Sequence, residues 1–269
     1  MENNSTVIDY YQGYNEDERL VKHPLEFIRT KDIISRYLSK KSMKILDLCG
    51  ASGHYSYWLT RLGHKVHLMD ISQKHIEEAA KNSEKYHCDL ASITIGDARA
   101  VNFDNSTFDM VLLMGALYHL HEKEDRILCI KEAYRILNNG GIAVFAYISR
   151  HASMLDGFLK GYINDPLYCN IMDEDINTGR HYNPENKPGY FTNAYFHSSK
   201  DIYDELSSVI FQNISLYSVE GFGGLLNTEE YIKDNDKLEK LQHYLRITEQ
   251  NMEMIGISFH QIAVCKKVN

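Results

Sequence analysis

The chain has 269 residues, of which 43% are hydrophobic and 25% are charged, and its formal net charge is −8. A chain of this length and composition buries a substantial hydrophobic core. The negative charge argues against nucleic acid as the main partner, because binding to a phosphate backbone needs clustered Lys and Arg. The five cysteines form no Cys-x-x-Cys pair, and no apolar run reaches the length of a membrane span. These features predict a soluble, cytoplasmic protein with no nucleic-acid or membrane partner.

Strand and helix patterns alternate along the first 150 residues. Short apolar runs typical of buried parallel strands occur at 43–49, 65–70, 92–95, 108–114 and 142–147. Helical spacing of apolar residues occurs at 26–39, and helices are also predicted at 53–62, 73–86 and 122–137. Five β-α units in a row predict an α/β protein with a mostly parallel, doubly wound sheet.

The alternation stops after residue 149. Residues 150–198 show no clear period, but their aromatic content argues against disorder and predicts a lid or cap over a site. Helix and strand return at 199–210 and 212–219, and a charged helix at 228–252 and a final strand at 257–266 follow.

The end of the first predicted strand reads Leu46-Asp47-Leu48-Cys49-Gly50-Ala51-Ser52-Gly53. Ligands of doubly wound sheets bind outside the carboxyl ends of the strands, and small residues let the backbone approach such a ligand closely. The helix that follows Gly53 presents free N–H groups to an anion, and the Asp47 carboxylate suits an amino group. A plain tight turn with a structural Asp would give the same pattern.

Two further acidic residues follow the next two strands. Asp70 lies about 20 residues after the glycine turn, a spacing that suits the paired hydroxyls of a ribose. Asp97, in Gly96-Asp97-Ala98, suits the amino group of an adenine, while a neighbouring backbone N–H donates to a ring nitrogen. Asp70 alone fits a nicotinamide enzyme equally well, and Asp97 alone fits a surface turn. The three acidic strand ends in order describe a nucleoside-containing cofactor.

These residues resemble the class I S-adenosylmethionine-dependent methyltransferases, and in particular a bacterial branch of the small-molecule type. The similarity extends through Phe108–Val111, Gly115–Leu120, Ile130–Leu137, Gly140-Gly141, Ile148–Arg150, Asp165-Pro166, Gly189–Thr192, Tyr195–His197, Glu220-Gly221 and Ser258–His260. It implies a Rossmann-like sheet of seven strands, the last one antiparallel, with helices on both faces and a cap inserted after strand five. The implied division is an N-terminal helical lid (1–40), a cofactor-binding core (41–149), a substrate cap (150–198) and the remainder of the core sheet with an inserted helix (199–269).

One departure from the family is visible in the glycine turn. The family usually has Asp-x-Gly-x-Gly-x-Gly, whereas the first two glycine places here hold Cys49 and Ala51, and only Gly53 is kept. Both side chains are small, so we expect S-adenosylmethionine to bind. Cys49 is expected to be a packing residue and not a nucleophile.

The resemblance and the predicted strand ends together give the expected contacts. Those to the cofactor are Tyr14, Arg29, Asp47, Cys49, Gly50, Ala51, Gly53, Asp70, Ile71, Asp97, Ala98 and Met114. Those to a small-molecule substrate are Tyr118, Arg150, Tyr190, Tyr195 and His197.

Methyl transfer depends mainly on holding the acceptor in line with the methyl–sulfur bond, so a general base is optional. His119, after strand four, is the expected base, with a hydrogen-bonded structural histidine as the alternative. No metal is expected, because His119-Leu120-His121 has no third ligand at a recognisable spacing.

Three other functions fit parts of the pattern. A nicotinamide-dependent oxidoreductase would need a third glycine to complete Gly-x-Gly-x-x-Gly, which is missing after strand one. A non-catalytic adenosylmethionine-binding protein would use the same fold. An RNA or protein acceptor is the third alternative. The sequence leaves the acceptor atom and the oligomeric state open.

Overall fold

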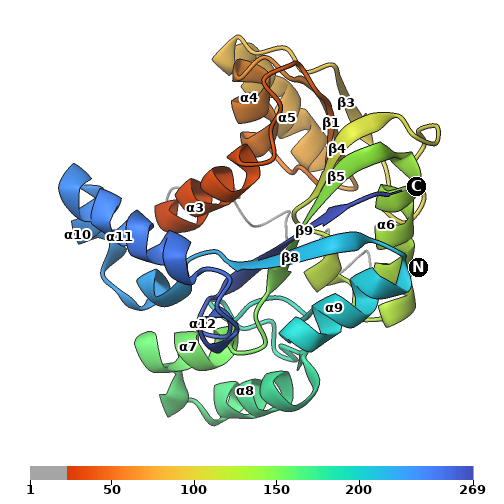
Figure 1. The fold of residues 1–269 in the computed structure, drawn as a ribbon. Coiled ribbons are helices and arrows are strands. Elements are labelled where there is room, and N and C mark those ends of the chain that lie inside the picture. Colours follow the sequence, from red (N-terminus) through yellow and green to blue (C-terminus); the bar gives the residue numbers. More distant parts are fainter. Residues whose placement is uncertain (1–22, 269) are drawn as a thin grey trace.

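The computed structural model describes residues 23–268 and contains one seven-stranded sheet, in the order β3-β2-β1-β4-β5-β9-β8 (Figure 1). The strands are β1 (Lys44–Leu48), β2 (Lys65–Asp70), β3 (Ser92–Ile95), β4 (Phe108–Leu113), β5 (Leu137–Ile148), β8 (Gln212–Ser218) and β9 (His260–Lys266). Strands β1 to β5 pair in parallel, and β9 runs antiparallel to both β5 and β8. The expected Rossmann-like sheet with an antiparallel last strand is therefore confirmed.

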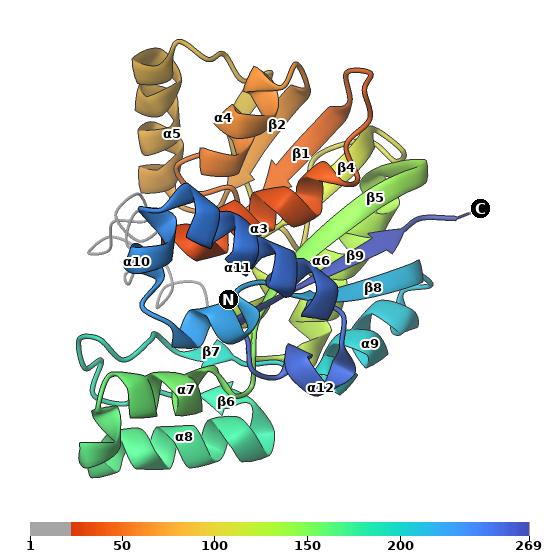
Figure 2. The same cartoon turned by 60° about the vertical axis from the view of Figure 1, so that its left-hand side comes forward.

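Helices cover both faces of this sheet (Figures 1 and 2). The main ones are α3 (Pro24–Ser35), α4 (His54–Arg61), α5 (Gln73–Tyr86), α6 (Lys123–Ile136) and α9 (Ser199–Ser208). Apolar residues of α3 and α4 pack on one face of the central strands, and those of α6 and α9 pack on the other. Strands β1 and β4 are thus buried on both sides, which explains why their sequences read as continuous apolar runs.

The inserted segment, which we define as residues 150–198, follows β5 and lies beyond one end of the sheet (Figure 2). It holds α7 (Ala152–Leu159), η2 (Tyr162–Asn164), α8 (Pro166–Thr178), β6 (Arg180–His181) and β7 (Ala194–Tyr195). Two helices were not expected here. The buried positions of α8 do have helical spacing, but one of them is Asp175, which interrupts the apolar pattern.

The single charged helix expected at 228–252 is also corrected. The structure has η3 (Gly221–Leu225), α10 (Thr228–Ile232), α11 (Asn235–Thr248) and α12 (Met252–Ile255). The Asp234 side chain accepts hydrogen bonds from the backbone N–H groups of Asp236 and Lys237, so it caps a new helix near the start of the predicted one.

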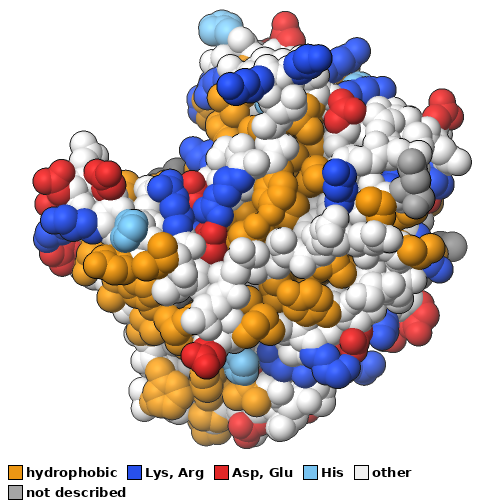
Figure 3. All heavy atoms as spheres, viewed as in Figure 1, with side chains coloured by type: hydrophobic (Ala, Val, Ile, Leu, Met, Phe, Trp, Pro, Cys, Tyr) orange, Lys and Arg blue, Asp and Glu red, His pale blue; other side chains and the backbone are white. Residues whose placement is uncertain are grey.

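The surface in Figure 3 has basic and acidic side chains interspersed, and hydrophobic side chains gather where α7 lies. Phe158 of α7 is 68% exposed. Within residues 23–268, no helix has both the length and the hydrophobicity needed to span a membrane.

Candidate active site

The turn after β1 has an unusual backbone. Cys49, Ala51 and Gly53 have φ angles of 64°, 47° and 92°. These are the three places where the resembling family usually has glycine, so the glycine-like conformation is kept although two of the residues are not glycine. Gly50 is needed for a different reason, since a Cβ there would lie 2.8 Å from the carboxyl carbon of Asp47. The departure in sequence therefore leaves the shape of the turn intact.

This geometry predicts that Ala51→Gly is tolerated or stabilising. A non-glycine residue in the left-handed region is strained by about 1 to 2 kcal/mol, and glycine loses about 0.4 to 1 kcal/mol through its freer unfolded chain. We expect urea unfolding to show a net gain of about 0.5 kcal/mol for Ala51→Gly and a loss for the β-branched Ala51→Val. Ala79→Gly in α5 is the control and should lose about 1 kcal/mol. A loss of similar size for Ala51→Gly would contradict the strain argument.

Asp47 is fully buried at the end of β1. One carboxylate oxygen accepts a 2.7 Å hydrogen bond from the Ser56 hydroxyl, while Oδ1 has no hydrogen-bond partner among the described residues. Burial raises the pKa of this carboxyl to about 6. A buried acceptor without a partner is costly, and the ammonium group of an amino acid would satisfy it.

Binding through Asp47 should therefore depend on pH. Below about pH 6 the carboxyl is protonated and cannot pair with an ammonium group, so the Kd for S-adenosylhomocysteine should rise, approaching tenfold per pH unit. In the ligand-free chain the sign is opposite. Because the folded-state pKa lies above the ordinary 3.8, the stability that this group contributes is lost as the pH rises from about 4 to 6. Calorimetric titrations between pH 5 and 8 test the first effect, and Asp47→Asn should abolish this pH dependence.

Asp70 ties the end of β2 to the turn after β1. Its carboxylate accepts hydrogen bonds from the backbone N–H of Ala51 (3.0 Å) and of Ser72 (2.9 Å). The Nδ1 atom of His75 lies 3.1 Å from the same carboxylate. The structure thus brings together the two segments that were expected to hold one cofactor, and Ile71 follows directly in the chain.

Asp97 is held by a partner that the sequence reading did not anticipate. The Arg99 guanidinium donates hydrogen bonds to both carboxylate oxygens of Asp97 and also pairs with Asp125 at 2.9 Å. Ala98, beside Asp97, is buried. The side chain expected to read an adenine is therefore fixed in place by an ion pair.

The end of β4 lies against the same turn. A Cβ on Gly115 would stand 3.5 Å from the carbonyl oxygen of Cys49, and Met114 precedes it. Burial, and then the carboxylate of Asp70, raise the pKa of the Cys49 thiol well above its ordinary value. Cys49 is thus a neutral thiol at physiological pH, as expected of a packing residue.

These residues fit S-adenosylmethionine. Asp47 offers an acceptor for the amino group, and the first N–H groups of α4 would donate to the carboxylate of the cofactor. Asp70 retains one acceptor site for a ribose hydroxyl, since a carboxylate has about four such sites and three groups already lie against it. Asp97 and Ala98 lie where an adenine is expected.

His119 lies in η1 (Leu117–His119) and is buried. Its ring stacks on Phe191, with centroids 5.7 Å apart, and touches the ring of Tyr118. Burial lowers the pKa of His119 to about 3, so the imidazole is neutral at physiological pH and is a weak proton acceptor. The catalytic role of His119 stays a prediction, and this environment favours the structural alternative.

The expected contact of Arg29 with the cofactor is contradicted by the structure. The Arg29 side chain has no exposed area, and it donates to Asp32, Glu249 and the backbone carbonyl of Val219. The guanidinium therefore joins α3 to α11 and β8 and has no group to offer a cofactor. Tyr14, the other contact expected from the N-terminal segment, lies outside the described residues.

Three residues expected to contact the substrate have side chains that contact other parts of the protein instead. Arg150 pairs with Asp201, and the ring of Tyr195 lies under the Arg126 guanidinium at 3.8 Å. His197 is fully buried, 3.5 Å from the Glu205 carboxylate. None of the three lines the cavity described next, because each is used to fasten the inserted segment to α6 and α9.

A cavity of about 580 Å³ lies between the inserted segment, α3, η3 and the adjoining ends of β5 and β9. Tyr118 and Tyr190, both expected as substrate contacts, line it. So do Phe191, Phe259 and His181. A cavity of this volume with several aromatic rings in its wall is typical of a small-molecule site.

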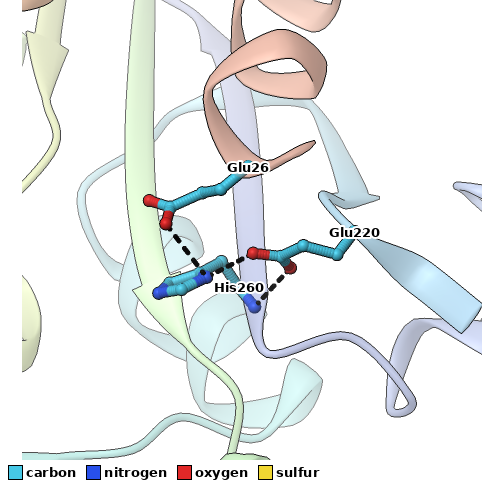
Figure 4. A group of neighbouring side chains, drawn as sticks. All are labelled: Glu26, Glu220 and His260. Carbon is cyan, nitrogen blue, oxygen red and sulfur yellow. Dashed lines mark hydrogen bonds and ion pairs between the residues drawn. The ribbon is translucent and has the colours of Figure 1, made fainter. Parts of the chain in front are cut away.

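One group of polar residues in this wall was missed by the sequence reading. Glu26 of α3, Glu220 after β8 and His260 of β9 point toward one another (Figure 4). Nδ1 of His260 lies 2.5 Å from Oε1 of Glu220 and 3.9 Å from Oε2 of Glu26. The signal in the sequence was that Glu26–Thr30, Glu220-Gly221 and Ser258–His260 lie in stretches that resemble the family.

Comparison with known proteins agrees with this geometry. Residues 45–141 match a family model described as a methyltransferase domain. The chloroplastic 2-phytyl-1,4-beta-naphthoquinone methyltransferase of Arabidopsis thaliana is 31% identical over 135 residues, which are 47% of this chain and 50% of that protein. The chain thus spans about half the length of this curated relative.

Solved structures share the fold at low identity. An S-adenosylmethionine-dependent methyltransferase of Methanosarcina mazei gives a TM-score of 0.59 at 18% identity, over 88% of this chain and 97% of that one. Phosphoethanolamine N-methyltransferase 2 of Haemonchus contortus, in complex with S-adenosylmethionine, gives 0.56 at 16%, over 91% and 52%. Residues 45–141 are therefore identified as a methyltransferase domain, and the chain shares the fold of solved S-adenosylmethionine-dependent methyltransferases.

Proposed function

We propose that this protein transfers a methyl group from S-adenosylmethionine to a small molecule held in the 580 Å³ cavity, with the inserted segment as its cap. The observation that carries this proposal is the position of Tyr118. Its hydroxyl donates to the carbonyl of Met114, at the cofactor end of β4, while the residue lines the cavity. The expected cofactor site and the cavity therefore adjoin.

The cofactor, when bound, supplies a methyl group that its sulfonium has already activated. The chain has to orient the two reactants and exclude water. Asp47 and Asp70 orient the cofactor at its amino group and at its ribose, and the aromatic wall positions the acceptor. The cavity size favours a small acceptor over RNA or protein, and the Arabidopsis relative, named for a naphthoquinone, supports this.

Two measurements test the proposal. Calorimetry should show micromolar binding of S-adenosylhomocysteine, of about −8 kcal/mol. The purified chain is then incubated with methyl-labelled S-adenosylmethionine and separate small-metabolite, RNA and protein fractions of a cell extract. Label is expected in a small metabolite. Label in RNA or protein alone would contradict the small-molecule proposal, and binding without any transfer would identify a non-catalytic protein.

A further inference from the structure

The carboxylate of Glu220 is fixed in one orientation. Its Oε2 atom accepts hydrogen bonds from the Ser258 hydroxyl (2.9 Å) and from the backbone N–H of His260 (3.0 Å). Its Oε1 atom lies 2.5 Å from Nδ1 of the same histidine. Three donors, one on Ser258 and two on His260, thus determine which oxygen faces the imidazole.

This arrangement selects one tautomer of His260. A carboxylate only accepts hydrogen bonds, so the short contact requires the proton to be on Nδ1. In the neutral imidazole Nε2 then carries a lone pair. Figure 4 shows the contacts of both carboxylates with the imidazole at Nδ1, and His260 lines the cavity with its side chain 27% exposed.

We propose that Nε2 of His260 accepts the proton of the methyl acceptor, which is therefore a molecule with an O–H or N–H group; this inference rests on the function proposed above. The acceptor heteroatom forms the bond to the methyl carbon while the carbon–sulfur bond breaks, and that electron pair returns to sulfur. The proton of the heteroatom passes to Nε2. Glu220 acts as a positioning residue, because it holds the tautomer and stabilises the imidazolium that forms.

The same wall restricts the charge of the acceptor. Glu26 and Glu220 are both buried, and Oε2 of Glu26 lies 3.9 Å from Nδ1 of His260. Two carboxylates beside the reacting group disfavour an anionic acceptor and favour a neutral or a cationic one. The rings of Tyr118 and Phe259 in the cavity wall suit a flat apolar body. The proposed substrate class is thus a neutral or cationic aromatic compound with a hydroxyl or amine.

The variant that tests this role is Glu220→Gln. The glutamine oxygen should take the place of Oε2, because the Ser258 hydroxyl and the His260 N–H both donate there. The amide NH₂ then faces Nδ1 and donates to it, which moves the imidazole proton to Nε2. The shape of the wall is kept, but Nε2 can no longer accept a proton.

Long-range ¹H–¹⁵N NMR of the histidine side chains, assigned with His260→Gln, reads the tautomer directly. The native chain is expected to carry the His260 proton on Nδ1, and Glu220→Gln to carry it on Nε2. An Nε2–H tautomer in the native chain would overturn the proposal, whether or not methyl transfer is found.

The second measurement is the initial rate of label transfer from methyl-labelled S-adenosylmethionine into the small-metabolite fraction. Glu220→Gln and His260→Gln are expected to lower this rate about 100-fold or more, with unchanged calorimetric affinity for S-adenosylhomocysteine. Glu229→Gln, which alters an exposed carboxylate of α10, is the matched control and should keep the native rate.

Three outcomes would overturn the proposal: a Glu220→Gln rate close to the native one, a methyl group found on an atom that carried no proton, or a rate lost in EDTA and restored by a divalent ion. The last would show that the cluster of Glu26, Glu220 and His260 holds a metal, which the spacing of its ligand atoms, within 4.8 Å, would also allow. If the native chain binds S-adenosylhomocysteine but labels nothing, the methyltransferase proposal itself fails, and the inference fails with it.

Discussion

Replacing Asp70 by alanine is expected to weaken binding of S-adenosylhomocysteine about 100-fold. One hydrogen bond from a ribose hydroxyl to a carboxylate contributes about 1.5 to 3 kcal/mol, and about 1.4 kcal/mol changes the Kd tenfold. The change also removes the acceptor for the backbone N–H groups of Ala51 and Ser72, so the turn after β1 should loosen. Calorimetry with the native and Asp70→Ala proteins measures the loss.

A second ligand separates these two contributions. An S-adenosylhomocysteine analogue without ribose hydroxyls should bind the native chain weakly and should be little affected by Asp70→Ala. Equal losses for both ligands would mean that Asp70 acts only through the turn. Asp89→Ala, at an exposed position, is the control and should leave both affinities unchanged.

The largest loss of stability is expected for Arg126→Met. Arg126 of α6 is 2% exposed and donates to the Glu205 carboxylate of α9 at 2.7 and 2.9 Å. It also donates to the carbonyls of Leu120 and His121 and lies over the ring of Tyr195. Removing it leaves a buried carboxylate and two carbonyls without this donor, which should lower the free energy of unfolding by about 3 to 5 kcal/mol.

Urea unfolding of the native protein and three variants checks this expectation. Lys200→Met breaks an exposed ion pair on the same helix, α9, and should leave the urea midpoint close to that of the native protein. The double variant Arg126→Met, Glu205→Leu removes both buried charges and should recover part of the loss. A loss below about 1 kcal/mol for Arg126→Met would show that water reaches the pair in solution.

The sequence determined much of the fold because the signals involved are local. The helix over 73–86 has its predicted ends, since Ser72 caps it and its buried positions follow a helical period. The short apolar runs became the central strands, because a strand buried on both faces needs apolar residues on both. The apolar period did not predict α8, because one of its buried positions holds the polar residue Asp175.

The residues expected to bind the cofactor could also be predicted from local sequence. Those in the cofactor-binding core lie at the carboxyl ends of parallel strands, and the topology of the sheet brings those ends to one edge whatever the packing around them. The turn after β1 is short, and its shape depends on a few neighbouring residues. The positive φ angles of Cys49 and Ala51 therefore follow from their places in the glycine motif.

Contacts between residues far apart in the sequence were decided by the tertiary structure alone. Arg29 looked available to a ligand, but it is bonded to Glu249, 220 residues away, and no spacing along the chain encodes that choice. The group of Glu26, Glu220 and His260 likewise comes from three separate elements, which only the order of strands β5, β9 and β8 and the packing of α3 bring together. The sequence therefore determined which cofactor the protein is built for, and the three-dimensional packing decided which side chains face the acceptor.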